Sequence, residues 1–579
     1  MGAAACARSR CGHHAQHAVD TASETAMYDY VIVGGGAAGC ALAARLSEEA
    51  GMRVLLLEAG PADTDPYIHM PVGFFKMTDG PLTWGYRTVA AAATQKRRIP
   101  FAQGRVLGGG SSINAMVYTR GQPADYDGWE RDGCTGWGFH DGVLPYLRRM
   151  EDNERLCDPY HGVGGPLGVS DLISVNELTK AFVRAGQEAG MPHNSDFNGA
   201  QQEGVGVYQV TQRNGRRCSA AAGYLRQARS RPNLTVRTDC LALRVVIENG
   251  RAAGVEFAPR GERASVTMVR ARREVIVTAG AIGSPKLLML SGIGRAQDLE
   301  RVGVQPVHVL DGVGQNLQDH FDIDIVYELN GPYSLDKYAK KHMMLLAGLE
   351  YKLFNKGPVT SNIAEAGAFW YSDGSVPTPD LQFHFLPGAG VESGVPPVPS
   401  GSGCTLNSYF LRPRSRGSVT LHSADPADAP RIDPAYIRDP HDLKIAVEGI
   451  RQSREIMRQS ALRKYLTREH FPGDKVASQA EYEAYAQAYG RTGYHPVGTC
   501  KMGIDELSVV DPQLRVHGIE GLRVADSSVM PRIVSSNTNA ATLMIAEKAA
   551  DLIRGLVAQP AREQAGTLGS MRPRKAMAA

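Results

Sequence analysis

The stretch "YDYVIVGGGAAGCALAARLSE", residues 28–48, decides the fold of this chain. An apolar run from Tyr30 to Val33 leads into Gly34, Gly36 and Gly39, spaced as G-x-G-x-x-G, and an Ala/Leu-rich helical pattern follows. In a dinucleotide fold these glycines allow a tight turn, a close approach to pyrophosphate and close packing of helix on strand. The free N–H groups of the helix N-terminus favour phosphate. The pattern therefore predicts a strand–turn–helix that binds a dinucleotide.

The second strand supports this prediction. "RVLLLEAG", residues 53–60, is an apolar run that ends at Glu58, 19 residues after Gly39. A carboxylate at this place accepts hydrogen bonds from both ribose hydroxyls and repels a 2′-phosphate. NADP is therefore disfavoured, while FAD and NAD share the fingerprint and both stay open at this point.

Composition narrows the class of protein. The chain has 579 residues, 43% of them hydrophobic, which is enough for two or more packed domains. The net charge is only +3 and no long basic run is present, so we expect no nucleic-acid partner. The nine cysteines are scattered, without CxxC pairs or zinc spacing. This favours free thiols in a cytoplasmic compartment and predicts no metal site.

The chain ends show no targeting or spanning segment. The stretch "VIVGGGAAGCALAA" is too short and too rich in glycine to cross a membrane, and residues 1–26 lack the apolar core of a secretory signal. We expect residues 1–26 to be a flexible extension and 557–579 a flexible tail. Whether residues 1–26 belong to the natural protein stays open, as does peripheral attachment to a membrane.

Three further segments carry signatures. "GRVLGGGSSINAMVYTRG" spans 104–121, "GAIGSPKLLMLSGIG" spans 280–294 and "DGVGQNLQDH" spans 311–320. Glycine-rich loops of this kind bring backbone N–H groups close to a flat or anionic ligand. Together with "HPVGTCKMG" at 495–503, they resemble the glucose-methanol-choline (GMC) family of FAD-dependent oxidoreductases. The resemblance runs from about Tyr28 to about Leu556.

The resemblance implies an α/β fold: a Rossmann-like FAD-binding domain with a discontinuous substrate-binding domain built on an antiparallel sheet. The expected FAD domain takes 27–160, 205–320 and 490–556, and the substrate domain takes 161–204 and 321–489. FAD is then held by backbone and side chains from several segments: Gly34, Gly36, Ala37, Ala38, Gly39, Glu58, Ala59, Trp84, Arg105, Gly109, Gly110, Ser111, Asn114, Ala115, Met116, Val117, Ala242, Ala279, Asp526, Asn537 and Thr538. Some members carry a tethering histidine where this chain has Ile113, so we expect FAD to be non-covalent.

A lone histidine in a Gly/Pro-rich loop such as "YHPVGTCKMG", residues 494–503, is by itself more often structural than catalytic. Oxidising an alcohol by hydride transfer to flavin N5 needs a base for the hydroxyl proton, and histidine, with an unperturbed pKa near 6.5, suits this role. The resemblance implies that His495 is this base. It also implies that Asn539, 44 residues on, holds the hydroxyl oxygen, although an asparagine there also suits a simple helix N-cap.

The substrate is less well defined. Stretches outside the FAD signatures, at 68–74, 213–226, 348–373 and 406–417, resemble the members that oxidise L-sorbose to L-sorbosone. They imply a sugar or polyol substrate, with Tyr494 and Asn407 as candidate contacts. Choline, aliphatic alcohols and polyethylene glycols stay open as substrates.

The acceptor and the class of reaction also leave alternatives. We expect a quinone, a cytochrome or a dye-like acceptor rather than oxygen, although an oxidase is not excluded. A photodecarboxylase-like lyase and a non-catalytic flavoprotein are remoter alternatives, and the presence of His495 counts against both. The oligomeric state stays open.

Overall fold

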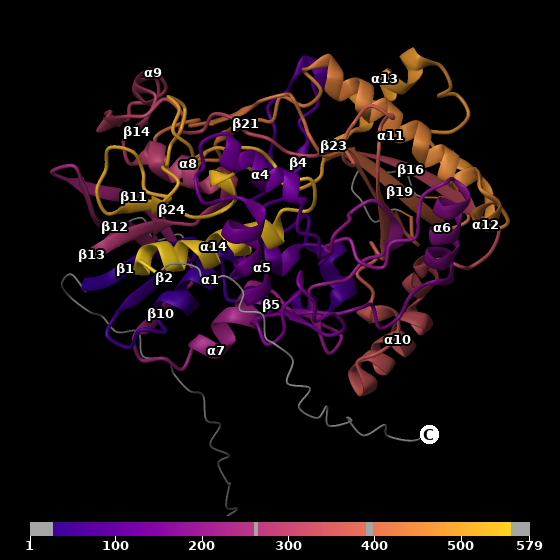
Figure 1. Cartoon of the computed structure of the whole chain (residues 1–579), viewed down its shortest axis with the longest axis horizontal. Helices are drawn as coiled ribbons and strands as arrows, with labels where there is room; N and C mark the ends of the chain where they lie inside the picture. Colours follow the sequence, from indigo (N-terminus) through magenta and orange to yellow (C-terminus); the bar gives the residue numbers. More distant parts are fainter. Residues whose placement is uncertain (1–26, 260–264, 390–397, 557–579) are drawn as a thin grey trace, which may run out of the picture.

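A computed structural model describes residues 27–259, 265–389 and 398–556 of the chain (Figure 1). The predicted extension at 1–26 and the predicted tail at 557–579 lie outside these residues. The described part contains two large sheets, each with helices packed against it.

The first sheet forms around the opening strand of the dinucleotide motif. Its order is β10 (Leu234–Arg237), β2 (Val54–Leu57), β1 (Met27–Val33), β13 (Thr267–Val277), β12 (Arg251–Pro259) and β11 (Cys240–Glu248), and β24 (Leu522–Val524) also pairs with β13. The pairings of β1 with β2 and β13, of β2 with β10 and of β13 with β24 are parallel. The ladder from β13 through β12 to β11 is antiparallel.

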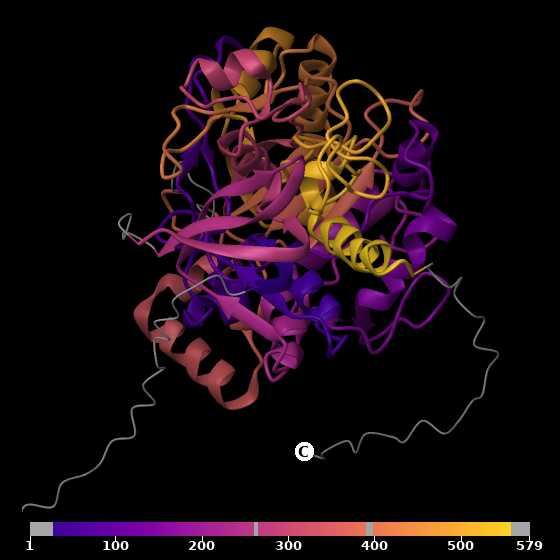
Figure 2. The same ribbon diagram turned by 90° about the vertical axis from the view of Figure 1, so that its left-hand side faces the viewer.

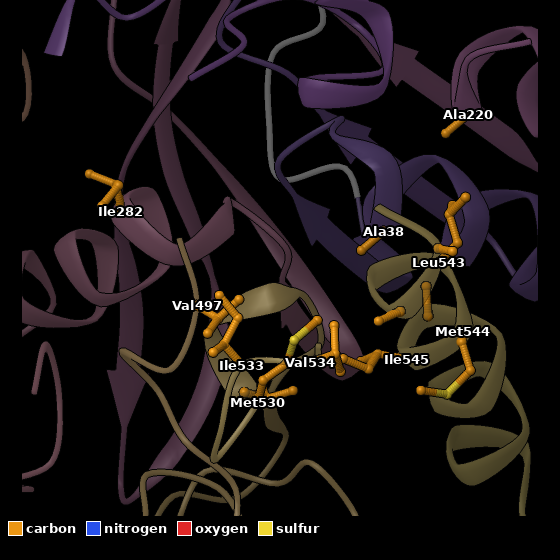
Figure 3. Close-up of a cluster of buried hydrophobic side chains, with 14 of the residues drawn as sticks. Ala38, Ala220, Ile282, Val497, Met530, Ile533, Val534, Leu543, Met544 and Ile545 are labelled. Carbon is orange, nitrogen blue, oxygen red and sulfur yellow. The ribbon is translucent and has the colours of Figure 1, made fainter. Parts of the chain in front are cut away.

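The burial of β1 on both faces of the sheet explains why its sequence is a continuous apolar run. All of its residues after Met27 are buried, as expected for a parallel strand covered on both faces. Helix α1 (Ala37–Leu46) follows the glycine turn and packs on α14 (Asn539–Arg554), although some 500 residues of chain separate them. Figure 3 shows this core, with Ala38 of α1 facing Leu543 and with Ile545 and Val534 nearby.

The second sheet is antiparallel throughout. Its order is β22 (Leu466–Phe471), β16 (Phe321–Leu329), β19 (Gly403–Phe410), β18 (Leu381–Leu386), β17 (Ala366–Trp370) and β7 (Gly204–Val207), and β23 (Arg491–Thr492) also pairs with β16. Helices α6 (Glu177–Glu188) and α11 (Pro440–Arg458) pack against it, and α13 (Gln479–Tyr489) packs on α11 (Figure 1).

Two short strands cross the predicted domain boundaries. β7 begins at Gly204 and β23 lies at 491–492, and both pair in the second sheet rather than the first. β23 therefore attaches the end of the substrate-side sheet directly to the loop that contains His495.

Shorter elements connect the two sheets. The helices are α2 (Pro66–His69), α3 (Gly110–Ile113), α4 (Pro123–Arg131), α5 (Leu144–Met150), α7 (Arg226–Ala228), α8 (Gly280–Leu290), α9 (Ala296–Glu300), α10 (Lys341–Phe354) and α12 (Ser460–Arg463). The strands are β3 (Tyr86–Arg87), β4 (Pro100–Phe101), β5 (Glu151–Asn153), β6 (Leu167–Val169), β8 (Gln212–Arg213), β9 (Arg216–Arg217), β14 (Ile293–Gly294), β15 (His308–Val309), β20 (Ser418–Thr420) and β21 (Arg431–Asp433). Short helical turns are η1 (Pro71–Lys76), η2 (Ala92–Thr94), η3 (Phe139–Val143), η4 (Ala221–Leu225), η5 (Leu335–Ala339), η6 (Pro358–Thr360) and η7 (Ser527–Val529).

None of the helices in the described residues combines the length and apolar character needed to cross a bilayer.

Candidate active site

One cavity between the two sheets gathers nearly all of the residues predicted from the sequence. Of the 25 candidates, every one except Gly39 and Arg105 lines it, including His495, Asn539, Tyr494 and Asn407. The lining includes residues of β1, the turn after β2, the segment 109–117, β11, α8, β16, β18, β19, the loop 493–496 and the N-terminus of α14. The predicted site residues, drawn from distant segments, therefore converge on one space.

The two exceptions, Gly39 and Arg105, contact residues that line the cavity. A Cβ atom on Gly39 would lie 1.9 Å from the carbonyl oxygen of Gly34, so this glycine allows α1 to pack on the turn. The guanidinium of Arg105 lies 4.7 Å from the ring centroid of Trp84, which does line the cavity.

The glycine turn forms a cradle suited to an anion. Gly36 is the N-cap of α1 and no side chain caps this helix, so its first N–H groups face the cavity beside Ala37 and Ala38. A Cβ atom on Gly109 would lie 2.7 Å from the Cα atom of Gly36, so only glycine lets the two loops meet. These features fit the pyrophosphate of a dinucleotide cofactor.

Glu58 is fixed at the edge of the same cavity. Its carboxylate accepts hydrogen bonds from the backbone N–H groups of Gly35 (2.8 Å) and Gly60 (2.7 Å), one on each oxygen. Burial raises the pKa of Glu58 to about 7. Each oxygen keeps a second lone pair, so the side chain can still accept hydrogen bonds from a ribose diol.

The loop from β23 presents His495 to the opposite end of the cavity. The buried carboxylate of Asp319 accepts hydrogen bonds from the backbone N–H of His495 (2.8 Å) and from the hydroxyl of Thr492 (2.6 Å). Tyr494 has a φ of 64°, a left-handed conformation that costs energy in a bulky residue. The hydrogen bonds on either side of Tyr494 hold this conformation and so fix where the imidazole points.

The hydrogen bonds around His495 determine which ring nitrogen carries its proton. Nε2–H of His320 donates to the carbonyl of Leu411 (3.2 Å), because a carbonyl can only accept. Nδ1 of neutral His320 is then an acceptor, so Nδ1–H of His495 donates to it across 3.0 Å. Nε2 of His495 therefore carries no proton, and its lone pair can accept a hydrogen bond.

Asn537 meets this lone pair. Its Nδ2 lies 3.0 Å from Nε2 of His495, and its Oδ1 accepts hydrogen bonds from Thr119 (2.9 Å) and Gln382 (3.0 Å). These two donors fix the amide orientation, so Nδ2 donates to the imidazole. The sequence prediction had given the place beside His495 to Asn539, but the structure brings Asn537 there. Asn539 is the first residue of α14, and two residues at the start of a helix point in different directions.

The imidazoles around the cavity are neutral. Burial, and then the neighbouring His320 and His384, hold the pKa of His495 well below 6.5. Burial also lowers the pKa of His320 and of His384 to about 3. His495 is therefore ready to accept a proton over the ordinary working range of pH.

Sequence reasoning had given no role to several residues of this cluster. His320, Tyr409 and Gln382 lie within hydrogen-bond or ring contact of His495 or Asn537. His384 contacts Gln382 and Tyr409 in the same cluster. His320 stood in the quoted signature "DGVGQNLQDH", which was the one available signal. The other three lie on β18 and β19, where an alternating strand pattern does not distinguish a site from a core.

The substrate side of the cavity contains a buried ion-pair cluster. Asn407, which lines the cavity, donates a hydrogen bond from Nδ2 to Asp322 (3.1 Å). Asp322 also lines the cavity and forms a buried ion pair with Arg491 (3.2 Å). Arg491 also pairs with the buried Asp324 (2.6 Å), so one arginine is shared by two carboxylates.

Comparison with known proteins assigns the class. The chain belongs to the GMC oxidoreductase family, whose two models match residues 28–322 and 413–546. The predicted family, its mixed α/β fold and its class of enzyme, an oxidoreductase acting on alcohol groups, are confirmed.

Particular relatives cover almost the whole chain. An alcohol dehydrogenase [acceptor] of Pseudomonas putida is 45% identical over 91% of this chain and 96% of its own. An oxygen-dependent choline dehydrogenase of Sinorhizobium medicae is 44% identical over 91% and 95%. A formate oxidase of Aspergillus oryzae, studied for modification of its FAD, matches with a TM-score of 0.86 and 28% identity over 92% and 99%. None of these names contains L-sorbose, which stays a prediction from the resemblance.

Proposed function

We propose that this chain is an FAD-dependent dehydrogenase that oxidises the CH–OH group of an alcohol to a carbonyl. The observation that carries the proposal is the unprotonated Nε2 of His495 at the cavity, where it accepts a hydrogen bond from Nδ2 of Asn537. FAD, when bound, supplies N5 as the hydride acceptor. The glycine cradle at Gly36 and Gly109 and the carboxylate of Glu58 hold its pyrophosphate and ribose.

The protein's own part in the reaction is to take a proton and hold an oxygen. A bound alcohol would replace the amide of Asn537 as the hydrogen-bond partner of Nε2 of His495, which then accepts the hydroxyl proton as the C–H bond breaks. The Nδ2 group of Asn537 stabilises the developing negative charge on that oxygen by a hydrogen bond. His320 keeps the proton of neutral His495 on Nδ1, so that the nitrogen facing the alcohol is the basic one.

Recognition of the rest of the substrate favours a neutral, hydroxylated molecule. The oxygens of Asp322 are engaged by Arg491 and Asn407, although Arg491 also pairs with Asp324, so the support for a hydroxylated substrate comes from the neutral polar groups and not from the balance of charge. The amide of Asn407 and the phenol of Tyr494 at the cavity wall suit further hydroxyl groups. L-sorbose, oxidised to L-sorbosone, is therefore the first substrate to test, with choline the second because of the relatives' names.

We propose that the reduced enzyme passes its electrons to a quinone or a cytochrome rather than to oxygen. We also propose that the enzyme is cytoplasmic. The bracketed word "acceptor" in the Pseudomonas putida relative's name favours this, whereas the oxygen-dependent choline dehydrogenase favours oxygen.

A spectroscopic experiment tests substrate and acceptor together. Purified enzyme is mixed anaerobically with L-sorbose, choline or a long-chain primary alcohol, and bleaching of the flavin bands is recorded. Air is then admitted, and flavin reoxidation and peroxide are measured. Bleaching by L-sorbose with slow reoxidation supports the full proposal, and bleaching by choline alone overturns the neutral substrate. Rapid reoxidation with stoichiometric peroxide overturns the dehydrogenase assignment.

A further inference from the structure

The surface of α10 (Lys341–Phe354) is apolar and exposed. Most of its large apolar side chains are open to solvent, including Leu345 (74% exposed), Leu353 (62%) and Phe354 (66%). The full set consists of Met344, Leu345, Leu346, Leu349, Leu353 and Phe354. The helix lies at the periphery of the molecule in both views, labelled in Figure 1 and as the salmon-coloured helix at the lower edge of Figure 2.

The exposed leucines form one face. Leu345, Leu349 and Leu353 recur every four residues and so lie along one side of the helix. Ala347 and Tyr351, the buried residues of the helix, are also four apart and lie on the opposite side. The leucine face is therefore directed away from the protein. Single exposed apolar residues are ordinary, but a continuous apolar face marks an interaction surface.

Basic side chains surround this face. The segment 337–356 contains five lysines, and its one carboxylate is Glu350. Lys341 and Lys352 are exposed and stand four and seven residues from Leu345, beside it on the helix surface. The remaining lysines flank the ends of the helix: Lys337, Lys340 and Lys356.

We propose that α10 docks on the surface of an anionic lipid membrane, with the leucine face among the acyl chains and the lysines at the headgroups. An apolar stripe edged by lysines is the pattern of helices that lie in the membrane interface. A helix of 14 residues spans only about 21 Å, so it lies on the bilayer rather than through it.

Charge favours a membrane over a second copy of the chain. A symmetric dimer through this face would bring the lysines of one α10 against those of the other, because a two-fold interface joins identical patches. Like charges that face each other across an interface oppose association. An anionic headgroup layer instead pairs with every lysine.

The docked helix stands close to the wall of the active-site cavity. Leu335 of η5, shortly before α10, packs in a cluster with Phe74 and Leu386, both of which line the cavity. The hydroxyl of Tyr351 donates to the carbonyl of His69 (3.5 Å), just before η1. Docking would thus bring the cavity near a lipid-soluble acceptor, a consequence that rests on the proposed function.

Vesicle co-sedimentation tests the docking without any substrate. The full chain with bound FAD is mixed with vesicles of phosphatidylcholine and phosphatidylglycerol in equal parts, or of phosphatidylcholine alone. We expect binding to the anionic vesicles that weakens with added salt. The triple substitution L345Q/L349Q/L353Q should lower the partition coefficient by about ten-fold or more, and Lys341→Glu with Lys352→Glu should abolish the preference for anionic lipid.

A matched control tests whether vesicle binding needs the leucine face of α10 or only exposed apolar side chains anywhere on the protein. Val307, Val309 and Ile504 are exposed to similar degrees outside α10, so V307Q/V309Q/I504Q should bind like the parent. FAD content and thermal unfolding of every variant, measured without lipid, should equal those of the parent, which shows that each variant is folded.

Three results would overturn the proposal. The first is the absence of binding to anionic vesicles, and the second is vesicle binding that persists in L345Q/L349Q/L353Q. The third is a parent protein that forms a dimer in sedimentation velocity, with a triple variant that is monomeric, while neither protein binds vesicles. The last result would assign the face to a second copy of the chain. Because none of these readouts involves turnover, loss of the proposed enzymatic function would leave the docking result unaffected.

Discussion

The two nitrogens of His495 meet different partners, and this difference decides which of them acts as a base. Nδ1 is committed to His320, and Nε2 faces the cavity and Asn537. The backbone of the same residue is held by Asp319. An unprotonated Nε2 at a cavity wall, beside an amide donor, is the arrangement that a general base needs, so the geometry favours the catalytic interpretation.

The pH dependence of flavin reduction follows from this environment. The base must be neutral, and burial holds its pKa well below 6.5. Activity should therefore be lost on acidification only below pH 6.5, and kcat/KM should be flat on the alkaline side of that value until another group titrates. Anaerobic reduction rates against pH measure this directly. An acid limb with its midpoint at or above 6.5 would contradict a buried, neutral His495.

The roles of the two asparagines are separable by substitution. Asn537→Ala removes the donor beside His495 and should slow flavin reduction by about 10²–10³, the range for one lost charge-stabilising donor. Asn539→Ala is the matched control from the same turn and should have a clearly smaller effect. Single-turnover reduction with equal flavin loading measures both. A larger loss for Asn539→Ala would restore the assignment made from the sequence.

At the residue scale the sequence predicted the base but not its surroundings. His495 was identified because it stands in a recognisable loop. Asn537 and Asn539 could not be separated by counting, because they stand two residues apart at a helix start and only the backbone direction shows which one faces the imidazole. His384 and Tyr409 were missed because their strands carry no motif.

Among the elements, the starts of α1 and α14 open into the same cavity. The N-caps Gly36 and Thr538 make no side-chain capping bond, and both line the cavity. Uncapped N-termini leave N–H groups for a ligand, and their positive dipole ends favour negative charge. The first helix start suits the phosphates, and the second suits charge that develops near His495.

The turn after β2 should control the affinity for FAD. Glu58→Ala removes a buried acceptor whose charge-assisted hydrogen bonds contribute about 1.5–3 kcal/mol each. The variant should lose flavin on dilution, while Glu58→Gln, which keeps one acceptor oxygen, should lose less. Because Gly35 and Gly60 also lose a partner, thermal unfolding of the apo forms is measured alongside. Full retention of FAD by Glu58→Ala would refute the ribose contact.

Long elements were predictable and short ones were not. The apolar runs of β1 and β2 and the helical spacing in α11 can be recognised without a structure, because periodicity over many residues is a strong signal. β23 has two residues and β7 has four, too few for a period. Their place in the second sheet comes from pairing partners distant in sequence.

In the molecule as a whole, the active site exists only where the two sheets meet. The cofactor side comes from the first sheet, while Asn407, His384 and the strand before His495 come from the second. The sequence resemblance predicted this discontinuous arrangement. It did not predict the exposed face of α10, because an amphipathic pattern does not tell whether a helix packs on protein or on lipid.

The mode of FAD attachment is testable on the whole protein. Ile113 lines the cavity where some family members carry a tethering histidine, and an aliphatic side chain cannot form such a bond. Precipitation with acid should therefore leave the yellow colour in the supernatant. Colour that stays in the pellet, with a mass increase on a cavity peptide, would show a covalent link.

The most direct test of the account is the rate at which substrate reduces the flavin in His495→Ala. Anaerobic stopped-flow mixing of the parent and the variant, each with FAD at full stoichiometry, isolates the step in which the proton leaves the alcohol. The account predicts reduction slower by about 10²–10⁴ with FAD binding intact, because the residues proposed to hold the pyrophosphate and ribose, at the glycine turn and Glu58, do not include His495. A fully flavinated variant reduced at the parental rate would contradict it and leave His495 as a buried structural histidine.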